Sequence, residues 1–175
     1  MLRTRLHADP HDKFLHNVIL DSCRRFGPKT AVVDTSCNRR FSYAEYGELV
    51  ETLARGVVAS SVRPGETVAI YLPNSWEFCA AYHATTMAGG IPTLLNPSYR
   101  EREVRYQLEN SGAAVLITDG QNVQGINLAG LPNLRRVFTT RQPVQGSEPF
   151  ANLLRSAKAS LPVPDRSSQE TLAAL

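Results

Sequence analysis

Short apolar runs alternate with helix-length segments from Thr67 onward, and this alternation constrains the fold more than any other feature. The runs TVAIYL (67–72) and AAVLITD (113–119) are continuously apolar, which is typical of strands buried on both faces. Residues 91–95 also have strand length, and RRVFTT (135–140) predicts a further strand. Strands that alternate with helices favour a parallel sheet with right-handed crossovers. The sequence therefore predicts an α/β fold, a doubly wound and mostly parallel sheet with helices on both faces. Its predicted strand core is Val68, Ile70, Ile91, Leu94, Val115, Ile117 and Val137.

Helix starts are marked by three stretches with the spacing of a capping box. In such a box the first side chain accepts from a backbone amide of the first turn, and a Glu three residues later reaches back. The stretches are Ser42–Glu45, Asn74–Glu77 and Ser98–Glu101. We expect a helix after each of them, with the second helix ending at the pair Gly89–Gly90.

The amino-terminal region predicts a helix followed by a hairpin. Asp9 and Pro10 are typical of a helix start, and Gly27 closes the helix. The runs TAVVD (30–34) and RRFSY (39–43), joined by TSCN, favour a β-hairpin.

The end of the chain predicts an incomplete unit. Its last stretch, SLPVPDRSSQETLAAL, is rich in Pro and Ser and contains neither a helix stop nor a closing strand. We expect residues 1–175 to form one incomplete amino-terminal α/β subdomain, in which residues 159–175 are a loop leading onward. A sheet cut in this way should expose apolar surface and self-associate.

Composition excludes several classes of protein. The net charge is +3, from 19 basic and 16 acidic residues that are interleaved, so nucleic-acid binding is not expected. Cys23, Cys37 and Cys79 lack the spacing of a zinc site or a disulfide framework. Neither a secretory signal nor an apolar run of membrane-spanning length is present, and we expect a cytoplasmic protein without a transmembrane segment.

Motifs for chemistry are sparse. The turns after Leu72, Leu95 and Asp119 are where a doubly wound sheet binds ligands, but none carries a glycine-rich phosphate-binding pattern. FGPKT (26–30) is interpreted as a helix exit, and Asp119 either caps the next turn or approaches a substrate. The residues supply no catalytic set and no metal-ligand set.

The sequence also predicts which aromatic and histidine side chains are buried. Trp76 and Tyr99 are expected to pack, and His83 is interpreted as a packed or boundary residue. The remaining histidines lie near the amino end, where we expect exposure, and these are His7, His11 and His16.

Four stretches, in their residues and in their order along the chain, resemble the sequences of one enzyme family. They are FSYAEYGELVETLARGV, RPGETVAIYLPNSWEFCAAYHATTMAGGIPTLLNP, SYREREVRYQLENSGAAVLITD and LPNLRRVF. Together they resemble the amino-terminal part of the adenylate-forming acyl-CoA synthetases, a family that includes 4-coumarate–CoA ligases, luciferases and peptide-synthetase adenylation domains. The resemblance spans Asp9 to Thr140.

This resemblance implies a two-step ligation. A carboxylate attacks the α-phosphate of ATP to give an acyl-adenylate and pyrophosphate, and the thiol of CoA then displaces AMP. ATP, Mg²⁺ and CoA are the implied cofactors of the full-length enzyme. The family's Ser/Thr/Gly/Lys phosphate loop would follow a stretch like QETLAAL, so we expect this piece alone to be inactive and to bind none of these cofactors.

The resemblance also implies a role for the turn at residues 96–98. Asn96, Pro97 and Ser98 match positions that lie towards the route of the CoA arm. A strand exit followed by a helix cap is the simpler explanation of the same residues, and both can hold at once. The residues of these stretches resemble CoA ligases more than peptide-synthetase domains, which favours CoA as the acceptor. The substrate is expected to be an acyl or aryl acid, and the resemblance does not identify it. Two other classes remain open, a non-catalytic interaction or scaffold module that retains the fold, and a flavodoxin-like small-molecule binder.

Overall fold

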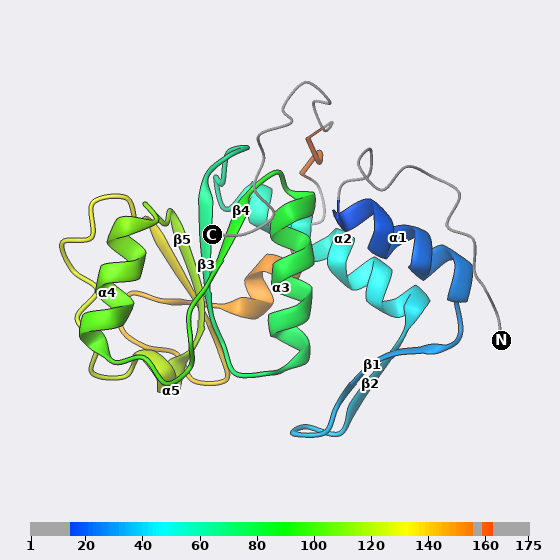
Figure 1. Ribbon diagram of the computed structural model, residues 1–175, viewed down its shortest axis with the longest axis horizontal. Helices are drawn as coiled ribbons and strands as arrows, with labels where there is room; N and C mark the ends of the chain where they lie inside the picture. The colour runs from blue at the N-terminus through cyan, green and yellow to red at the C-terminus, as the bar shows by residue number, and fades with distance from the viewer. Residues whose placement is uncertain (1–14, 156–158, 163–175) are drawn as a thin grey trace, which may run out of the picture.

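A parallel sheet of five strands lies at the centre of the computed structural model, which describes residues 15–155 and 159–162 (Figure 1). The strands are β3 (Thr67–Tyr71), β4 (Ile91–Leu94), β5 (Val115–Asp119), β6 (Arg136–Thr140) and β7 (Glu148–Pro149). Their spatial order is β4-β3-β5-β6-β7, and every neighbouring pair is parallel. Along the chain, β4 is therefore added on one side of β3, whereas β5, β6 and β7 are added in succession on the other side.

Helices cover both faces of the sheet (Figure 1). On one face lie α2 (Tyr43–Ala59), α3 (Trp76–Met87) and the 3-10 helix η2 (Phe150–Arg155); on the other lie α4 (Glu101–Asn110) and the short α5 (Gly120–Val123). Alternate strand residues belong to the two hydrophobic cores, because successive side chains of a strand point to opposite faces. The prediction of a doubly wound α/β fold is confirmed.

A helix and a hairpin precede the sheet. Helix α1 (Leu15–Phe26) packs on α2, and β1 (Thr30–Asp34) pairs antiparallel with β2 (Arg39–Ser42) in a hairpin that extends from the body (Figure 1). Both predictions are confirmed, and Gly27 closes α1 with φ +38°. The predicted helix start at Asp9 and Pro10 lies outside the described residues.

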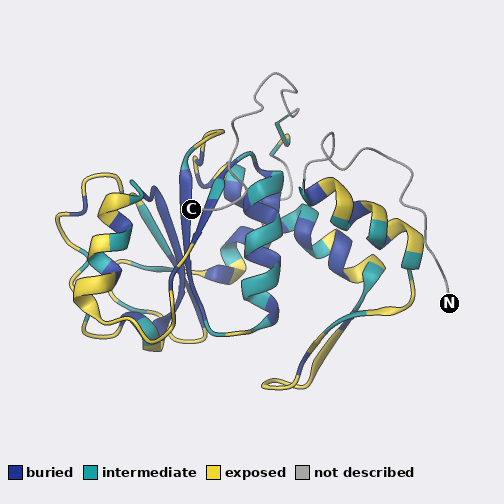
Figure 2. Ribbon diagram, viewed as in Figure 1, coloured by how far each residue is buried: buried dark blue, intermediate teal, exposed yellow. Residues whose placement is uncertain are grey.

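The predicted core is right for the central strands and wrong for the edge strand. Val68, Ile70, Val115 and Ile117 are buried, and Figure 2 shows the buried sheet between its helices. Leu94 is 37% exposed because β4 is the edge strand of the described sheet. The remaining two members are half-buried, and they are Ile91 and Val137.

The three capping boxes have different outcomes. Ser42 and Glu45 form the predicted box, with Ser42 Oγ accepting from the amide of Glu45 at 3.2 Å and Glu45 Oε2 accepting from the amide of Ser42 at 2.8 Å. At α3 the predicted box is wrong by one residue, since Ser75 is the N-cap and its Oγ accepts from the Phe78 amide at 3.3 Å.

The predicted box at Ser98–Glu101 is also wrong, because α4 begins at Glu101 itself. Arg100 is the N-cap, and Glu103 Oε2 accepts from the Arg100 amide at 3.1 Å. Local spacing allows both registers, and the turn that precedes the helix decides between them.

The last part of the described chain packs against α2. Strand β7 and helix η2 were not predicted, because a two-residue strand and a six-residue 3-10 helix carry too little periodicity. Arg55 Nη1 then donates to the carbonyl oxygen of Ala159 at 2.9 Å. Residues 163–175 of the predicted loop lie outside the described residues. Among the helices of the described residues, none combines the length and apolarity needed to cross a membrane.

Candidate functional site

The carboxyl ends of β3 and β5 mark the point where the direction of strand order changes. Doubly wound sheets bind ligands at this point, because the loops on either side diverge and leave a crevice. A cavity of about 380 Å³ lies here, which we call the switch-point cavity. Its walls include the turn after β4 and the segment after β5, through Pro97, Tyr99, Arg100, Gln121, Asn122 and Gln124.

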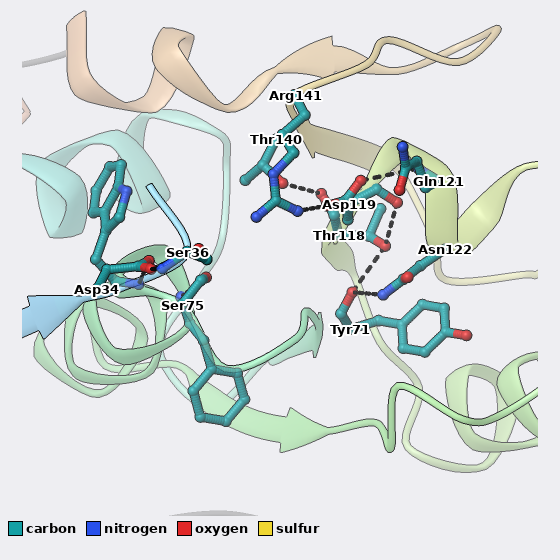
Figure 3. A network of polar contacts seen from close by, with 12 residues as sticks. Asp34, Ser36, Tyr71, Ser75, Thr118, Asp119, Gln121, Asn122, Thr140 and Arg141 are labelled. Carbon is teal, nitrogen blue, oxygen red and sulfur yellow. Dashed lines mark hydrogen bonds and ion pairs between the residues drawn. The ribbon is translucent and has the colours of Figure 1, made fainter. Parts of the chain in front are cut away.

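Tyr71, the last residue of β3, also lines the cavity. It is 1% exposed, and its hydroxyl donates to the carbonyl oxygen of Tyr99 at 2.7 Å. Its own carbonyl oxygen accepts from Thr118 Oγ1 at 3.0 Å and from Asn122 Nδ2 at 3.3 Å (Figure 3). Burial raises the pKa of the Tyr71 phenol, while the charge of Arg100 opposes this shift. The phenol therefore stays protonated and can serve as a donor.

The turn after β4 has its own hydrogen bonds. The Tyr99 amide donates to the Asn96 carbonyl oxygen at 2.9 Å, and the Ser98 amide donates to Asn96 Oδ1, also at 2.9 Å. Such an Asx turn holds the backbone without help from other elements. Asn96, Pro97 and Ser98 are exposed, and Pro97 lines the cavity.

A second polar cluster lies at the ends of β5 and β6 (Figure 3). Asp119 is 2% exposed, caps α5 by accepting from the Gln121 amide at 3.0 Å, and forms an ion pair with Arg141. Arg141 has a left-handed backbone with φ +57°. A Cβ on Gly120 would lie 1.9 Å from the carbonyl oxygen of Gln142, so only glycine permits this approach. Asp119 is therefore a structural cap that ties two loops together.

Asp34, the last residue of β1, fixes the hairpin to the amino-terminal end of α3. Its Oδ1 accepts from the Ser36 hydroxyl at 2.6 Å, and its Oδ2 accepts from the Trp76 amide at 3.0 Å (Figure 3). The Ser36 hydroxyl, followed by the amides of Trp76 and Ser36, lowers the pKa of Asp34 to about 2. Asp34 thus stays ionised and accepts hydrogen bonds, and it is not poised as a general base.

The other candidate side chains also have structural roles. His83 Nδ1 lies 2.7 Å from the Tyr46 hydroxyl and joins α3 to α2, and burial lowers its pKa. The prediction of a packed or boundary residue is confirmed, since His83 is half-buried between these helices. His16, expected to be exposed, is buried, and His7 and His11 lie outside the described residues. Trp76 is buried as expected, whereas Tyr99 is 37% exposed because it lies on the cavity wall.

The switch-point cavity is lined by polar side chains, but the described residues supply no metal-ligand set. No group of three or more His, Cys, Asp or Glu side chains that could hold a metal ion occurs within residues 15–155 and 159–162. The three cysteines are free, and burial raises the pKa values of the Cys23 and Cys79 thiols.

Sequence reasoning pointed to the sheet edge where the cavity lies but missed several of its residues. Tyr71 was treated only as part of a strand, and Thr118, Asn122 and Arg141 were not singled out. A signal existed for Tyr71, since a hydroxyl-bearing ring at the end of the otherwise apolar run TVAIYL must find a partner when buried.

A family model described as "AMP-binding enzyme" matches residues 19–175. The chain is also similar to "4-coumarate--CoA ligase 3" of Arabidopsis thaliana, at 28% identity over 145 residues that make up 83% of this chain and 26% of that protein. The chain thus spans about a quarter of the length of this relative.

Solved structures match over most of this chain. A long-chain-fatty-acid-CoA ligase of Archaeoglobus fulgidus matches with a TM-score of 0.80 at 22% identity, over 93% of this chain and 34% of that one. The apo structure of Mycobacterium smegmatis MbtA matches with a TM-score of 0.80 at 26% identity, over 93% of this chain and 31% of that one. Both have the fold described above.

Proposed function

Because the chain belongs to the AMP-binding enzyme family, we propose that it is the amino-terminal part of an ATP-dependent acyl- or aryl-CoA ligase. The observation that most supports this proposal is the family match over residues 19–175, together with the cavity at the switch point of the sheet. Such a ligase joins a carboxylic acid to a thiol through an acyl-adenylate. The identity of the acid is left open, because no residue described above forms a carboxylate pocket.

The described residues do not fit the phosphates of ATP or their Mg²⁺. The turns after β3 and β5 lack a phosphate-binding glycine pattern, and residues 15–155 and 159–162 contain no acidic or His cluster for a metal ion. We therefore assign no step of the adenylation to them. The parts that bind the nucleotide would have to lie elsewhere in a complete ligase.

The switch-point cavity does fit the acceptor arm. Its wall after β5 carries three carboxamides, Gln121, Asn122 and Gln124, which offer donors and acceptors to the amide groups of a pantetheine chain. Pro97 and Tyr99 offer apolar surface opposite them. CoA supplies the attacking thiol, and the residues Asn96, Pro97 and Ser98 would border its path.

Carboxylate-dependent ATP–pyrophosphate exchange tests this proposal. The complete ligase that contains this chain should catalyse exchange with one acid from a panel of fatty and aromatic acids, and should release AMP when CoA is added. Absence of exchange with every acid would favour a non-catalytic module of the same fold or a small-molecule binder.

The 175-residue chain alone should catalyse no exchange and bind no ATP. Calorimetry with ATP and Mg²⁺ measures this, and micromolar affinity would refute our placement of the nucleotide site. We also propose that this chain self-associates through apolar surface such as the exposed Leu94 at the edge of the sheet. Light scattering that reports a monomer at high concentration would contradict that expectation.

A further inference from the structure

Tyr71 connects the two walls of the switch-point cavity. Its hydroxyl donates to the backbone of the turn after β4, at the carbonyl oxygen of Tyr99, over 2.7 Å. Its carbonyl oxygen accepts from Thr118 and Asn122 on the β5 side, at 3.0 and 3.3 Å. One nearly inaccessible residue, 1% exposed, is thus bonded to both sides of the crevice.

The turn after β4 is held internally by its own hydrogen bonds, and it begins after Leu95, whose amide donates to the carbonyl oxygen of Ile70 in β3 at 3.0 Å. Both of its hydrogen bonds run within residues 96–99, from the amides of Ser98 and Tyr99 to the oxygens of Asn96. These bonds preserve the shape of the turn if the turn moves as a unit. The Leu95 amide holds the start of the turn to β3, and the Tyr71 hydroxyl holds its far end, because it joins the carbonyl oxygen of Tyr99 to the interior of the sheet.

We propose that Tyr71 is a positioning residue that sets the width of the acceptor path by holding the turn 96–99 in place. This inference rests on the proposed function for the identity of the ligand, an amide-containing thiol arm. The first half-reaction does not use the acceptor thiol, so loss of the Tyr71 hydroxyl should leave adenylation unchanged. Binding of the acceptor should weaken, because the path must be re-formed each time the arm enters.

The kinetic test compares Tyr71→Phe with Tyr106→Phe in the complete ligase. Both variants lose one phenolic hydroxyl, but Tyr106 is 69% exposed on the outer face of α4. We expect Tyr71→Phe to raise the KM for CoA about fivefold, the effect of losing one ordinary hydrogen bond, with kcat and pyrophosphate exchange unchanged. Tyr106→Phe should change neither. An unchanged KM in Tyr71→Phe, or an equal loss of exchange and thioester formation, overturns the proposal.

A second measurement does not depend on the proposed function. Hydrogen–deuterium exchange of the 175-residue chain should be about threefold faster for the amides of residues 96 and 98–100 in Tyr71→Phe, and unchanged in Tyr106→Phe. Equal exchange in Tyr71→Phe and the unsubstituted chain refutes the positioning role whatever the activity. If exchange of these amides accelerates while the complete ligase forms no adenylate, the proposed function fails and the structural role of Tyr71 stands.

Discussion

The approach of η2 to α2 at Gly56 leads to a quantitative prediction for Gly56→Ala. A methyl group at this position would lie 1.9 Å from the carbonyl oxygen of Leu153 and 2.6 Å from its carbonyl carbon. Since ordinary contacts begin at about 3.4 Å, the two backbones must separate by roughly 1.5 Å. A backbone carbonyl cannot rotate away as a flexible side chain can, so η2 itself must move.

The cost follows from what η2 buries. Leu153 and Phe150 are 2% and 5% exposed, and full burial of such side chains is worth roughly 1.5–3 kcal/mol each. Losing about half of this burial costs about 2 kcal/mol, and residual strain adds about 1 kcal/mol. The higher helix propensity of Ala returns about 1 kcal/mol. We therefore expect Gly56→Ala to lower the free energy of unfolding by about 2 kcal/mol.

Urea unfolding of the 175-residue chain measures this change. Trp76, its one tryptophan, has its ring 6.0 Å from that of Phe150, so its fluorescence reports on the packing of η2. Gly47→Ala in the same helix is the matched control, because its methyl group would meet the Cys23 side chain at 3.0 Å. That variant should lose less than about 1 kcal/mol. A Gly56→Ala chain as stable as the control, with unchanged Trp76 emission, would refute this reasoning.

Three further perturbations test other parts of the molecule. Thr85→Val should raise the free energy of unfolding by about 1 kcal/mol, because the Thr85 hydroxyl is fully buried and has no hydrogen-bond partner among the described residues; a lower urea midpoint would contradict this. Asp34→Asn should destabilise the chain at neutral pH. The difference should shrink below about pH 4 and vanish as the pH falls through the folded-state pKa of about 2, since this pKa lies below the ordinary value; a constant difference between pH 2 and pH 7 in urea unfolding would exclude this linkage. In the complete ligase, the double change Asn96→Ala and Ser98→Ala should raise the KM for CoA severalfold, because loss of Asn96 Oδ1 removes the acceptor of the Ser98 amide and loosens the turn; a CoA dependence identical to that of the unsubstituted enzyme would remove these residues from the path.

Local signals predicted much of the fold. The box formed by Ser42 and Glu45 and the hairpin formed by residues 30–34 and 39–42 depend on bonds between near neighbours, and both were found where the sequence predicts them. The box expected at Ser98 failed, because two overlapping registers satisfy the same spacing. The turn that begins at Asn96 uses the Ser98 amide and moves the helix start to Glu101.

Long-range arrangement decided the rest. Leu94 has the same apolar character as its neighbours, yet it is exposed because β4 is at the edge of the described sheet. Pro92, which lacks a backbone N–H, was the one local signal of an edge strand, and the prediction did not use it. The switch-point cavity likewise requires β3 and β5 to be adjacent although α3, β4 and α4 separate them in sequence.

The sequence by itself determined the α/β class, the alternation of strands and helices, and the family resemblance, because these follow from the periodicity of apolar residues and from turn chemistry over a few residues. Only the tertiary structure decided which strand is at the edge and that the Tyr71 hydroxyl meets the carbonyl oxygen of Tyr99. Such contacts join segments 28 residues apart, and they depend on how whole elements pack rather than on any local preference.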